Sequence, residues 1–157
     1  MLQVTKGDLF DPAHKFFGLA QGVNAQGIMG AGIAVAFREK FPDMYEDYKK
    51  ECATYGSFLP GLIHTYQEKN DGLVIYNLFS QDYPGKNGDY KMLETAAYLM
   101  RRDAEDRFGG LTAMGWDVKI GLPWIGCGIA GLARHNVLHI LDRQLQDSPV
   151  RFVIVEQ

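Results

Sequence analysis

A run of small and apolar residues that breaks into glycines, and then resumes with helical spacing, constrains the fold of this chain more than any other feature. Residues 18–23 are small or apolar and predict a buried strand. Gly27, Gly30 and Gly32 follow, and an apolar segment with helical periodicity comes next. In a strand–loop–helix unit, backbone N–H groups and the positive end of the helix dipole converge on one point. The sequence therefore predicts that this loop holds a phosphate or a diphosphate.

A second glycine loop repeats the pattern later in the chain. Residues 118–125 predict a strand, and Gly126, Gly128 and Gly131 then alternate with apolar residues. Glycine lets the backbone approach a ligand closely. Because both loops follow strands and precede helices, we expect both at the carboxyl edge of one sheet, where α/β folds bind ligands. Two such loops would clamp a diphosphate without a cationic side chain, which agrees with the formal net charge of −3.

Strands alternate with helices along the chain, which predicts an α/β domain with a largely buried sheet. A pair of glycines, Gly109-Gly110, is expected to end the third helix. Besides the two strands already named, the pattern predicts strands over residues 2–5, 61–67, 73–79 and 150–155, and helices over residues 30–41, 42–52, 89–108 and 135–146.

Composition bounds the class of protein. The chain has 157 residues, 46% of them hydrophobic and 22% charged, so we expect residues 1–157 to form a single soluble domain. The negative net charge gives no basic surface for sequence-independent nucleic-acid binding, although contact with a nucleic-acid end or a small nucleotide is compatible with it. No apolar run spans a bilayer and no signal-peptide pattern is present. Cys52 and Cys127 lie in unlike contexts, so a reducing, cytoplasmic setting is expected.

Each of two polar residues has two possible roles. Asn24 stands where the strand meets the first loop, and its amide suits either a turn cap or a hydrogen bond to a sugar hydroxyl. Asp8 follows Gly7, and its carboxylate suits either an Asx turn or the exocyclic amine of a base.

Other reactive or aromatic side chains favour structural roles. Cys127 lies between two glycines without a neighbouring histidine to activate it, which favours packing over nucleophilic catalysis. His135 and His139 lie one helical turn apart but lack the glutamate of a His-Glu-x-x-His site, so we expect surface histidines and no metal. Trp124 and Tyr83 are candidates to stack on a base, although core packing is the commoner fate of a Trp beside a strand.

Together these residues resemble the macro domain family, the ADP-ribose-binding α/β/α fold. Residues 7–9 (Gly-Asp-Leu) match the family's Gly-Asp-Ile/Leu, and residues 23–27 (Val-Asn-Ala-Gln-Gly) match its Val-Asn-x-x-Gly segment. Residues 29–34 are similar to the branch that contains terminal ADP-ribose glycohydrolases and antitoxins that remove ADP-ribose from DNA. Residues 125–129 (Ile-Gly-Cys-Gly-Ile) match the Ile-Gly-Cys-Gly-Leu loop of that branch.

The resemblance implies a three-layer α/β/α sandwich with a central mixed, mostly parallel sheet. It implies that Asp8 binds the adenine amine with the amide of Leu9 nearby, and that Asn24 contacts the distal ribose. Backbone amides of both loops would wrap the diphosphate. The loop residues implied in this role are Gly30, Ala31, Gly32 and Ile33 in the first loop and Gly126, Cys127, Gly128, Ile129 and Ala130 in the second.

The chain departs from the lysine-dependent hydrolases of this branch. Their lysine follows the strand equivalent to residues 74–79, where this chain has Gln81, and the acidic residue that some members carry in the second loop corresponds to Ala130. A glutamine amide is no nucleophile, so a covalent lysyl intermediate is not available at that position. Lys86, in the same loop, is the candidate substitute. The second Asn of the other hydrolase branch falls at Gly27.

The resemblance implies an enzyme that hydrolyses an ADP-ribose derivative carried on protein or nucleic acid. Asn24, Gln81 and a substrate phosphate would position water against the distal ribose, with backbone amides stabilising charge. The alternatives are a non-catalytic ADP-ribose reader or sequestering module, an ADP-ribose-1″-phosphate phosphatase, and a site for another small nucleotide. No cofactor and no membrane partner are expected, and a monomer is the default. The residue that stacks on adenine is open among Phe10, Tyr83 and residues 155–156.

Overall fold

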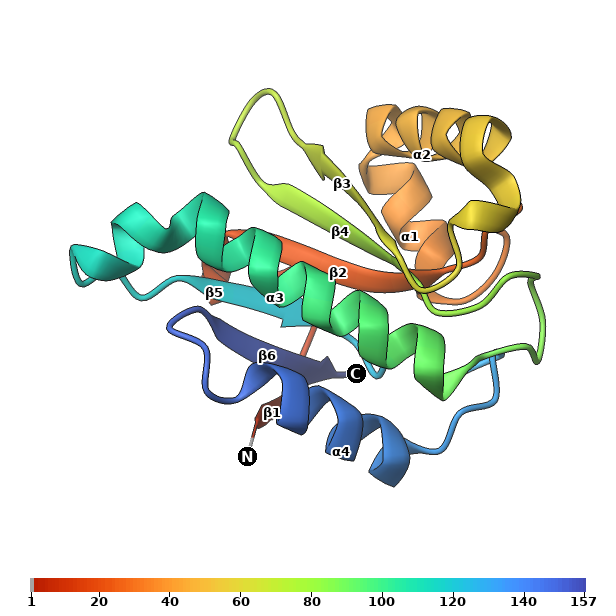
Figure 1. Cartoon of the computed structure of the whole chain (residues 1–157). Coiled ribbons are helices and arrows are strands. Elements are labelled where there is room, and N and C mark those ends of the chain that lie inside the picture. Colours follow the sequence, from red (N-terminus) through yellow and green to blue (C-terminus); the bar gives the residue numbers. More distant parts are fainter. Residues whose placement is uncertain (1) are drawn as a thin grey trace.

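The computed structural model describes residues 2–157 and folds them around one six-stranded sheet (Figure 1). The strand order is β1-β6-β5-β2-β4-β3, and all neighbours pair in parallel except β3 and β4. The predicted mixed, mostly parallel sheet is confirmed. The strands are β1 (Gln3–Lys6), β2 (Gly18–Val23), β3 (Ile63–Gln67), β4 (Val74–Phe79), β5 (Lys119–Leu122) and β6 (Arg151–Glu156). The helices are α1 (Ile33–Lys40), α2 (Pro42–Tyr55), α3 (Tyr90–Ala113) and α4 (Arg134–Leu145), with short 3₁₀ helices at Pro12–His14 and Gly56–Phe58.

Helices cover the sheet on both faces, α3 and α4 on one and α1 and α2 on the other (Figure 1). The strand β4, which lies between β2 and the edge strand β3, is buried along its whole length. Tyr76 and Leu78 pack in the core beneath α3 and α4, whereas Ile75 and Phe79 pack in the core beneath α1 and α2. Side chains that alternate between two apolar layers are what a strand buried on both faces requires. The predicted three-layer α/β/α sandwich is confirmed.

The first glycine loop is longer than its sequence pattern suggests. A helix was expected from residue 30, but α1 begins at Ile33. Gly32 has φ 62° and ψ −146°, which lies outside the helical region and close to values that only glycine adopts readily. Residues 30–32 therefore remain in the loop, outside the helix, at the carboxyl edge of the sheet.

The predicted end of the third helix is wrong. Gly109 and Gly110 lie inside α3, which continues to Ala113 and is followed by Gly115 at φ +89°. Each helical glycine costs about 1 kcal/mol relative to alanine. Leu111 packs against the core beneath α3, so its burial offsets that cost. The strand β5 also ends early, at Leu122, because Pro123 has no N–H to donate to a ladder.

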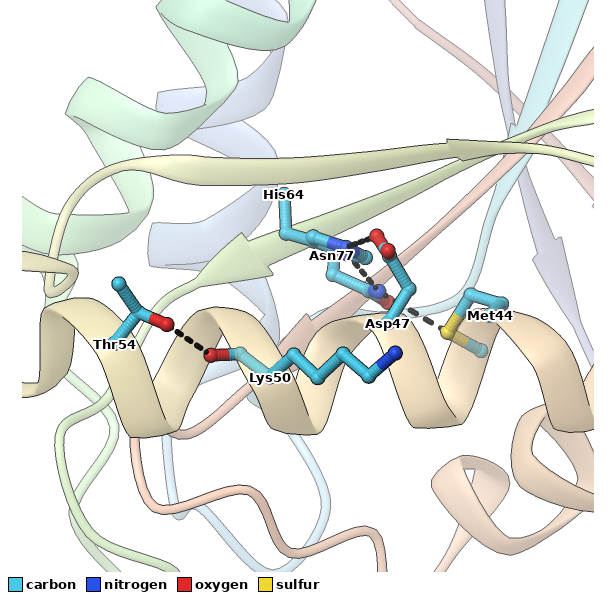
Figure 2. A network of polar contacts seen from close by, with 6 residues as sticks. All are labelled: Met44, Asp47, Lys50, Thr54, His64 and Asn77. Carbon is cyan, nitrogen blue, oxygen red and sulfur yellow. Dashed lines mark hydrogen bonds and ion pairs between the residues drawn. The ribbon is translucent and has the colours of Figure 1, made fainter.

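A chain of polar side chains crosses the layer between α2 and the sheet (Figure 2). Asp47 Oδ2 lies 2.7 Å from His64 Nε2, and Asn77 Nδ2 lies 3.0 Å from His64 Nδ1. Gln21 Nε2 donates to Asn77 Oδ1 at 2.9 Å and lies 3.7 Å from Met29 Sδ in the first glycine loop. Gln21 Oε1 has no partner in the described part of the chain. The network ties β2, β3, β4 and α2 together beneath that loop.

Candidate functional site

A cavity of about 530 Å³ opens at the carboxyl edge of the sheet. Its walls include residues 28–34 of the first glycine loop and residues 123–126 and 128–130 of the second. The strands that lead into these loops, β2 and β5, are neighbours in the sheet and run parallel. The prediction that the two loops meet at one edge is confirmed. The remaining walls come from residues 22–24 at the end of β2, from the segment after β4, from Arg134 and from residues 155–157.

Backbone donors from both loops have no hydrogen-bond partner within residues 2–157. The N–H groups of residues 30–32 and 128–130 make no hydrogen bond with any other residue of the described chain. Other amides of the second loop are used locally, since Cys127 N donates to Trp124 O at 3.1 Å and Leu132 N to Gly126 O at 2.8 Å. Unpaired N–H groups on a concave wall form an anion-binding surface. The arrangement suits a ligand with two linked phosphates.

Asn24 acts as a turn cap. Its Nδ2 donates to Ile28 O at 2.8 Å, and its Oδ1 accepts from Gln26 N at 3.0 Å. Tyr48, buried on α2, donates its hydroxyl to the main-chain oxygen of Asn24 at 2.6 Å. Asn24 also lines the cavity, and its Nδ2 carries a second hydrogen. The capping role is therefore compatible with the predicted sugar contact, which stays a prediction.

Burial keeps the side chains of Tyr48 and Cys52, which contact Asn24, in their neutral forms. Desolvation raises the pKa of Tyr48 well above its usual value, and the neighbouring Cys52 adds to the effect. Desolvation also raises the pKa of the Cys52 thiol. Both groups remain protonated near neutral pH, so the hydroxyl stays available as a donor to the loop.

A cluster of Trp124, Arg134 and Glu156 in the cavity wall was not foreseen in the sequence. Arg134, the first residue of α4, lines the cavity and forms an ion pair with Glu156, with Nη1 to Oε1 at 2.6 Å. The same carboxylate oxygen accepts from Trp124 Nε1 at 2.9 Å. The pattern predicted a helix from residue 135, one residue too late. A basic residue directly after a glycine loop at the ligand-binding edge was the signal available.

Comparison with known proteins gives this geometry a context. No family model matches the sequence. An ADP-ribose 1″-phosphate phosphatase from Meyerozyma guilliermondii is 35% identical over 112 residues, and the match covers 69% of this chain and 55% of that protein. The chain therefore spans about half the length of this relative. Human ADP-ribose glycohydrolase OARD1 is 26% identical over 149 residues, which cover 95% of this chain and 87% of that protein.

The solved structures decide the fold. The macrodomain of Thermus aquaticus DarG aligns with a TM-score of 0.77 and 26% identity, covering 100% of this chain and 98% of that one. The chain is a macrodomain. The resemblance inferred from the two glycine loops is thereby confirmed.

In this macrodomain, the two residues implied for adenine lie outside the cavity lining. Asp8 Oδ1 accepts from Phe10 N at 2.9 Å, which is the Asx turn that the sequence allowed. Leu9 is buried in the core beneath α1 and α2. Asp8 nevertheless follows β1 beside the end of β6, since Gly7 N donates to Glu156 O at 2.9 Å. A role for Asp8 and Leu9 at the adenine end stays a prediction.

The two candidate catalytic residues after β4 are placed differently. Gln81 lines the macrodomain cavity, and its Nε2 donates to Tyr83 O at 2.8 Å. Lys86 is not among the lining residues; its alkyl stem packs so closely on Gly131 that a Cβ there would lie 2.7 Å from Lys86 Cγ. Ala130 also lines the cavity. Of the two candidates, Gln81 contributes to the cavity wall and Lys86 does not, and a catalytic role for either stays a prediction.

The remaining candidates of the sequence analysis have structural surroundings. Cys127 packs against the core beneath α3 and α4, and burial raises the pKa of its thiol, which agrees with the packing role. His135 and His139 are exposed on α4, as expected of surface histidines. Of the stacking candidates, Trp124 and residues 155–156 line the macrodomain cavity, whereas Tyr83 lines a separate cavity of about 490 Å³.

Proposed function

We propose that this macrodomain binds ADP-ribose in the cavity at the carboxyl edge of the sheet and hydrolyses an ADP-ribose derivative carried on protein or nucleic acid. The observation that carries the proposal is the set of unpaired N–H groups at residues 30–32 and 128–130, drawn from two loops onto one cavity. A diphosphate between two sugars is the ligand chemistry that uses both loops at once. The names of the two relatives, a phosphatase and a glycohydrolase of ADP-ribose compounds, support the same class.

The chemistry proposed is the positioning of water rather than covalent catalysis. Asn24 and Gln81 carry neutral amides, which orient a water molecule and a ribose hydroxyl but do not attack carbon. The backbone amides of the loops stabilise negative charge that develops on the substrate. A phosphate of the substrate itself serves as the base that takes a proton from the attacking water, since neither amide does so. The bond that breaks joins the distal ribose C1″ to the attached group.

The same cavity is compatible with two alternative functions. The 35% identity to a phosphatase favours removal of a 1″-phosphate. The absence of the branch's lysine and acid, at Gln81 and Ala130, favours a reader that binds without turnover. Another small nucleotide in the cavity would be exposed by competition against ADP-ribose.

Calorimetry with ADP-ribose tests binding, and three substrates separate the functions. ADP-ribosylated protein, ADP-ribosylated DNA and ADP-ribose 1″-phosphate are each incubated with the protein, and product release is followed. Release of ADP-ribose from either of the first two supports the hydrolase, and release of phosphate from the third supports the phosphatase. Binding without turnover of any substrate assigns the reader, and no binding at millimolar ADP-ribose contradicts the whole proposal.

Three variants test which residues contribute to hydrolysis. Asn24→Ala is expected to abolish product release, and Gln81→Ala to reduce it by about 10²-fold, the range expected for loss of a group that positions the reactants. Lys86→Ala is the matched control in the same segment and is expected to retain activity. Loss of turnover in Lys86→Ala with full activity in Gln81→Ala would contradict the assignment.

Residues 1–157 are proposed to act as one binding unit and as a monomer. Within residues 2–157, no helix combines the length and apolar character that crossing a membrane requires. Cys52 and Cys127 are both free thiols, which supports a reducing compartment such as the cytoplasm.

A further inference from the structure

The charged side chains that line the cavity are few and sit together. Among the lining residues described, Arg134 is the one basic side chain and Glu156 the one acidic side chain. They lie at the same end, where α4 begins and β6 finishes. The rest of the described wall offers backbone N–H groups, neutral polar side chains such as Asn24 and Gln81, and apolar surface, so Arg134 and Glu156 are the charged side chains that a ligand meets there.

Arg134 is held in place by two contacts. Its Nη1 donates to Glu156 Oε1 at 2.6 Å, and its guanidinium carbon lies 5.2 Å from the centroid of the Trp124 ring. Glu156 Oε1 also accepts from Trp124 Nε1 at 2.9 Å. One carboxylate oxygen thus positions both the ring and the cation. The arrangement fixes a guanidinium beside the cavity instead of leaving it free in solvent.

Arg134 and Glu156 are too exposed for their ion pair to contribute much to the stability of the fold. The side chain of Arg134 is 60% exposed and that of Glu156 is 24% exposed. An ion pair at such a position contributes about 0–1 kcal/mol to folding. Guanidinium has five N–H donors in a planar fork that matches phosphate oxygens, and the bond to Glu156 uses one of them. The other donors remain for a ligand.

We propose that Arg134 binds the diphosphate of the ligand and sets the cavity's preference for doubly charged nucleotides, with Glu156 as its positioning residue. The inference rests on the proposed function for the identity of the ligand. It extends that function because the glycine loops by themselves supply only neutral donors. The fixed guanidinium supplies the counter-charge, and Glu156 moderates the affinity because its carboxylate repels the same phosphates.

Charge-changing variants of the full chain test the proposal by calorimetry at low and high salt, with ADP-ribose and inorganic pyrophosphate as probes. Arg134→Gln is expected to weaken ADP-ribose binding about ten-fold and to flatten its salt dependence, because a charge-assisted contact is lost. Arg134→Lys is expected to restore the salt dependence but only part of the affinity, since it keeps the charge without the fork. Glu156→Gln keeps an acceptor for both partners, removes the repulsion, and is expected to tighten binding.

The outcomes separate this inference from the proposed function. Unchanged affinity and salt dependence in Arg134→Gln, or weaker binding in Glu156→Gln, would overturn the inference while the wild type still bound ADP-ribose. Pyrophosphate binding that depends on Arg134, in a protein that does not bind ADP-ribose, would support the inference and overturn the proposed function. Binding of neither probe by the wild type overturns both.

Discussion

The hydroxyl of Tyr48 makes the short hydrogen bond that links α2 to the first glycine loop at Asn24, beside a longer contact from Cys52 Sγ at 4.0 Å. The hydroxyl is buried and lies 2.6 Å from the Asn24 main-chain oxygen. Tyr48→Phe keeps the ring and removes this donor, so the buried carbonyl of Asn24 keeps only the weak thiol contact from Cys52. We expect the free energy of unfolding to fall by about 1–3 kcal/mol.

Urea denaturation of both proteins measures that change. Tyr45→Phe is the matched control, because Tyr45 stacks against Tyr48 at a centroid distance of 6.3 Å but is only partly buried. Its stability is expected to stay within about 0.5 kcal/mol of the wild type. Equal losses in the two variants would contradict a specific role for the Tyr48 hydroxyl at the loop.

Gly32 is one of the residues of the first glycine loop whose backbone conformation disfavours a side chain. Its φ of +62° strains any L residue although nothing lies within 4 Å of a Cβ there. Gly32→Ala is expected to rearrange the loop and to weaken ADP-ribose binding about ten-fold or more, since strain of about 1–3 kcal/mol is involved. Gly30→Ala, whose Cβ would meet Ile28 Cγ2 at an ordinary 3.5 Å, is expected to bind more tightly than Gly32→Ala in calorimetry. The reverse order of affinities would rule out backbone strain as the reason for glycine.

At the scale of the element, α3 carries two glycines that nothing in the described structure requires. Gly109 and Gly110 are helical, and a Cβ at either position meets no atom within 4 Å. Gly109→Ala and Gly110→Ala are each expected to raise the free energy of unfolding by about 0.4–1 kcal/mol, because alanine restricts the unfolded chain. Thermal unfolding measures the effect. A loss of stability in either variant would mean that α3 needs flexibility at this point.

Local sequence patterns predicted most helices and strands because turn residues and the periodicity of apolar residues determine where these elements form. Apolar runs bounded by turn residues placed β2 over residues 18–23 in both sequence and structure, and the polar turn before β4 ends at Gly72, which has φ +75°. The end of α3 was missed because burial of Leu111, a tertiary effect, outweighs the helix propensity of glycine. Arg134 was missed as a wall residue because its place depends on β6 and Trp124, which lie far away in the chain.

At the scale of the whole molecule, alkaline pH is expected to destabilise the fold. Burial raises the pKa of Tyr48 and Tyr76, and it also raises the pKa of Cys52 and Cys127. A group whose pKa is raised by folding stabilises the protein below its unfolded pKa, and that contribution disappears as the pH rises above it. The thiols and phenols ionise in the unfolded chain from about pH 8.5 and 10 respectively, so stability is expected to fall above about pH 9.

Urea denaturation between pH 7 and 11 measures this decline. In Tyr48→Phe the part of the decline above pH 10 is expected to be shallower, because one of the raised groups is gone. Stability that stays constant up to pH 11 would contradict the account of these buried groups.

The shared edge of the two glycine loops could be predicted from the rule for α/β sheets, whereas the strand order could not. Each loop follows a strand and precedes a helix, and in parallel sheets such loops gather at one edge. The order β1-β6-β5-β2-β4-β3 depends on pairings between residues distant in sequence, such as Thr5 with Val155, and no local pattern encodes them. A ligand-binding cavity at this edge could therefore be predicted from the sequence, whereas the presence of Arg134 and Glu156 in its wall could be found only from the fold.

The central claim is that both loops bind one diphosphate through their main-chain nitrogens. Titration of ¹⁵N-labelled protein with ADP-ribose, followed by NMR of the backbone amides, tests it most directly. The account predicts that the amides of residues 30–32 and 128–130 shift together and saturate at one ligand per chain. Shifts confined to one of the two loops, or no shift at millimolar ADP-ribose, would contradict it.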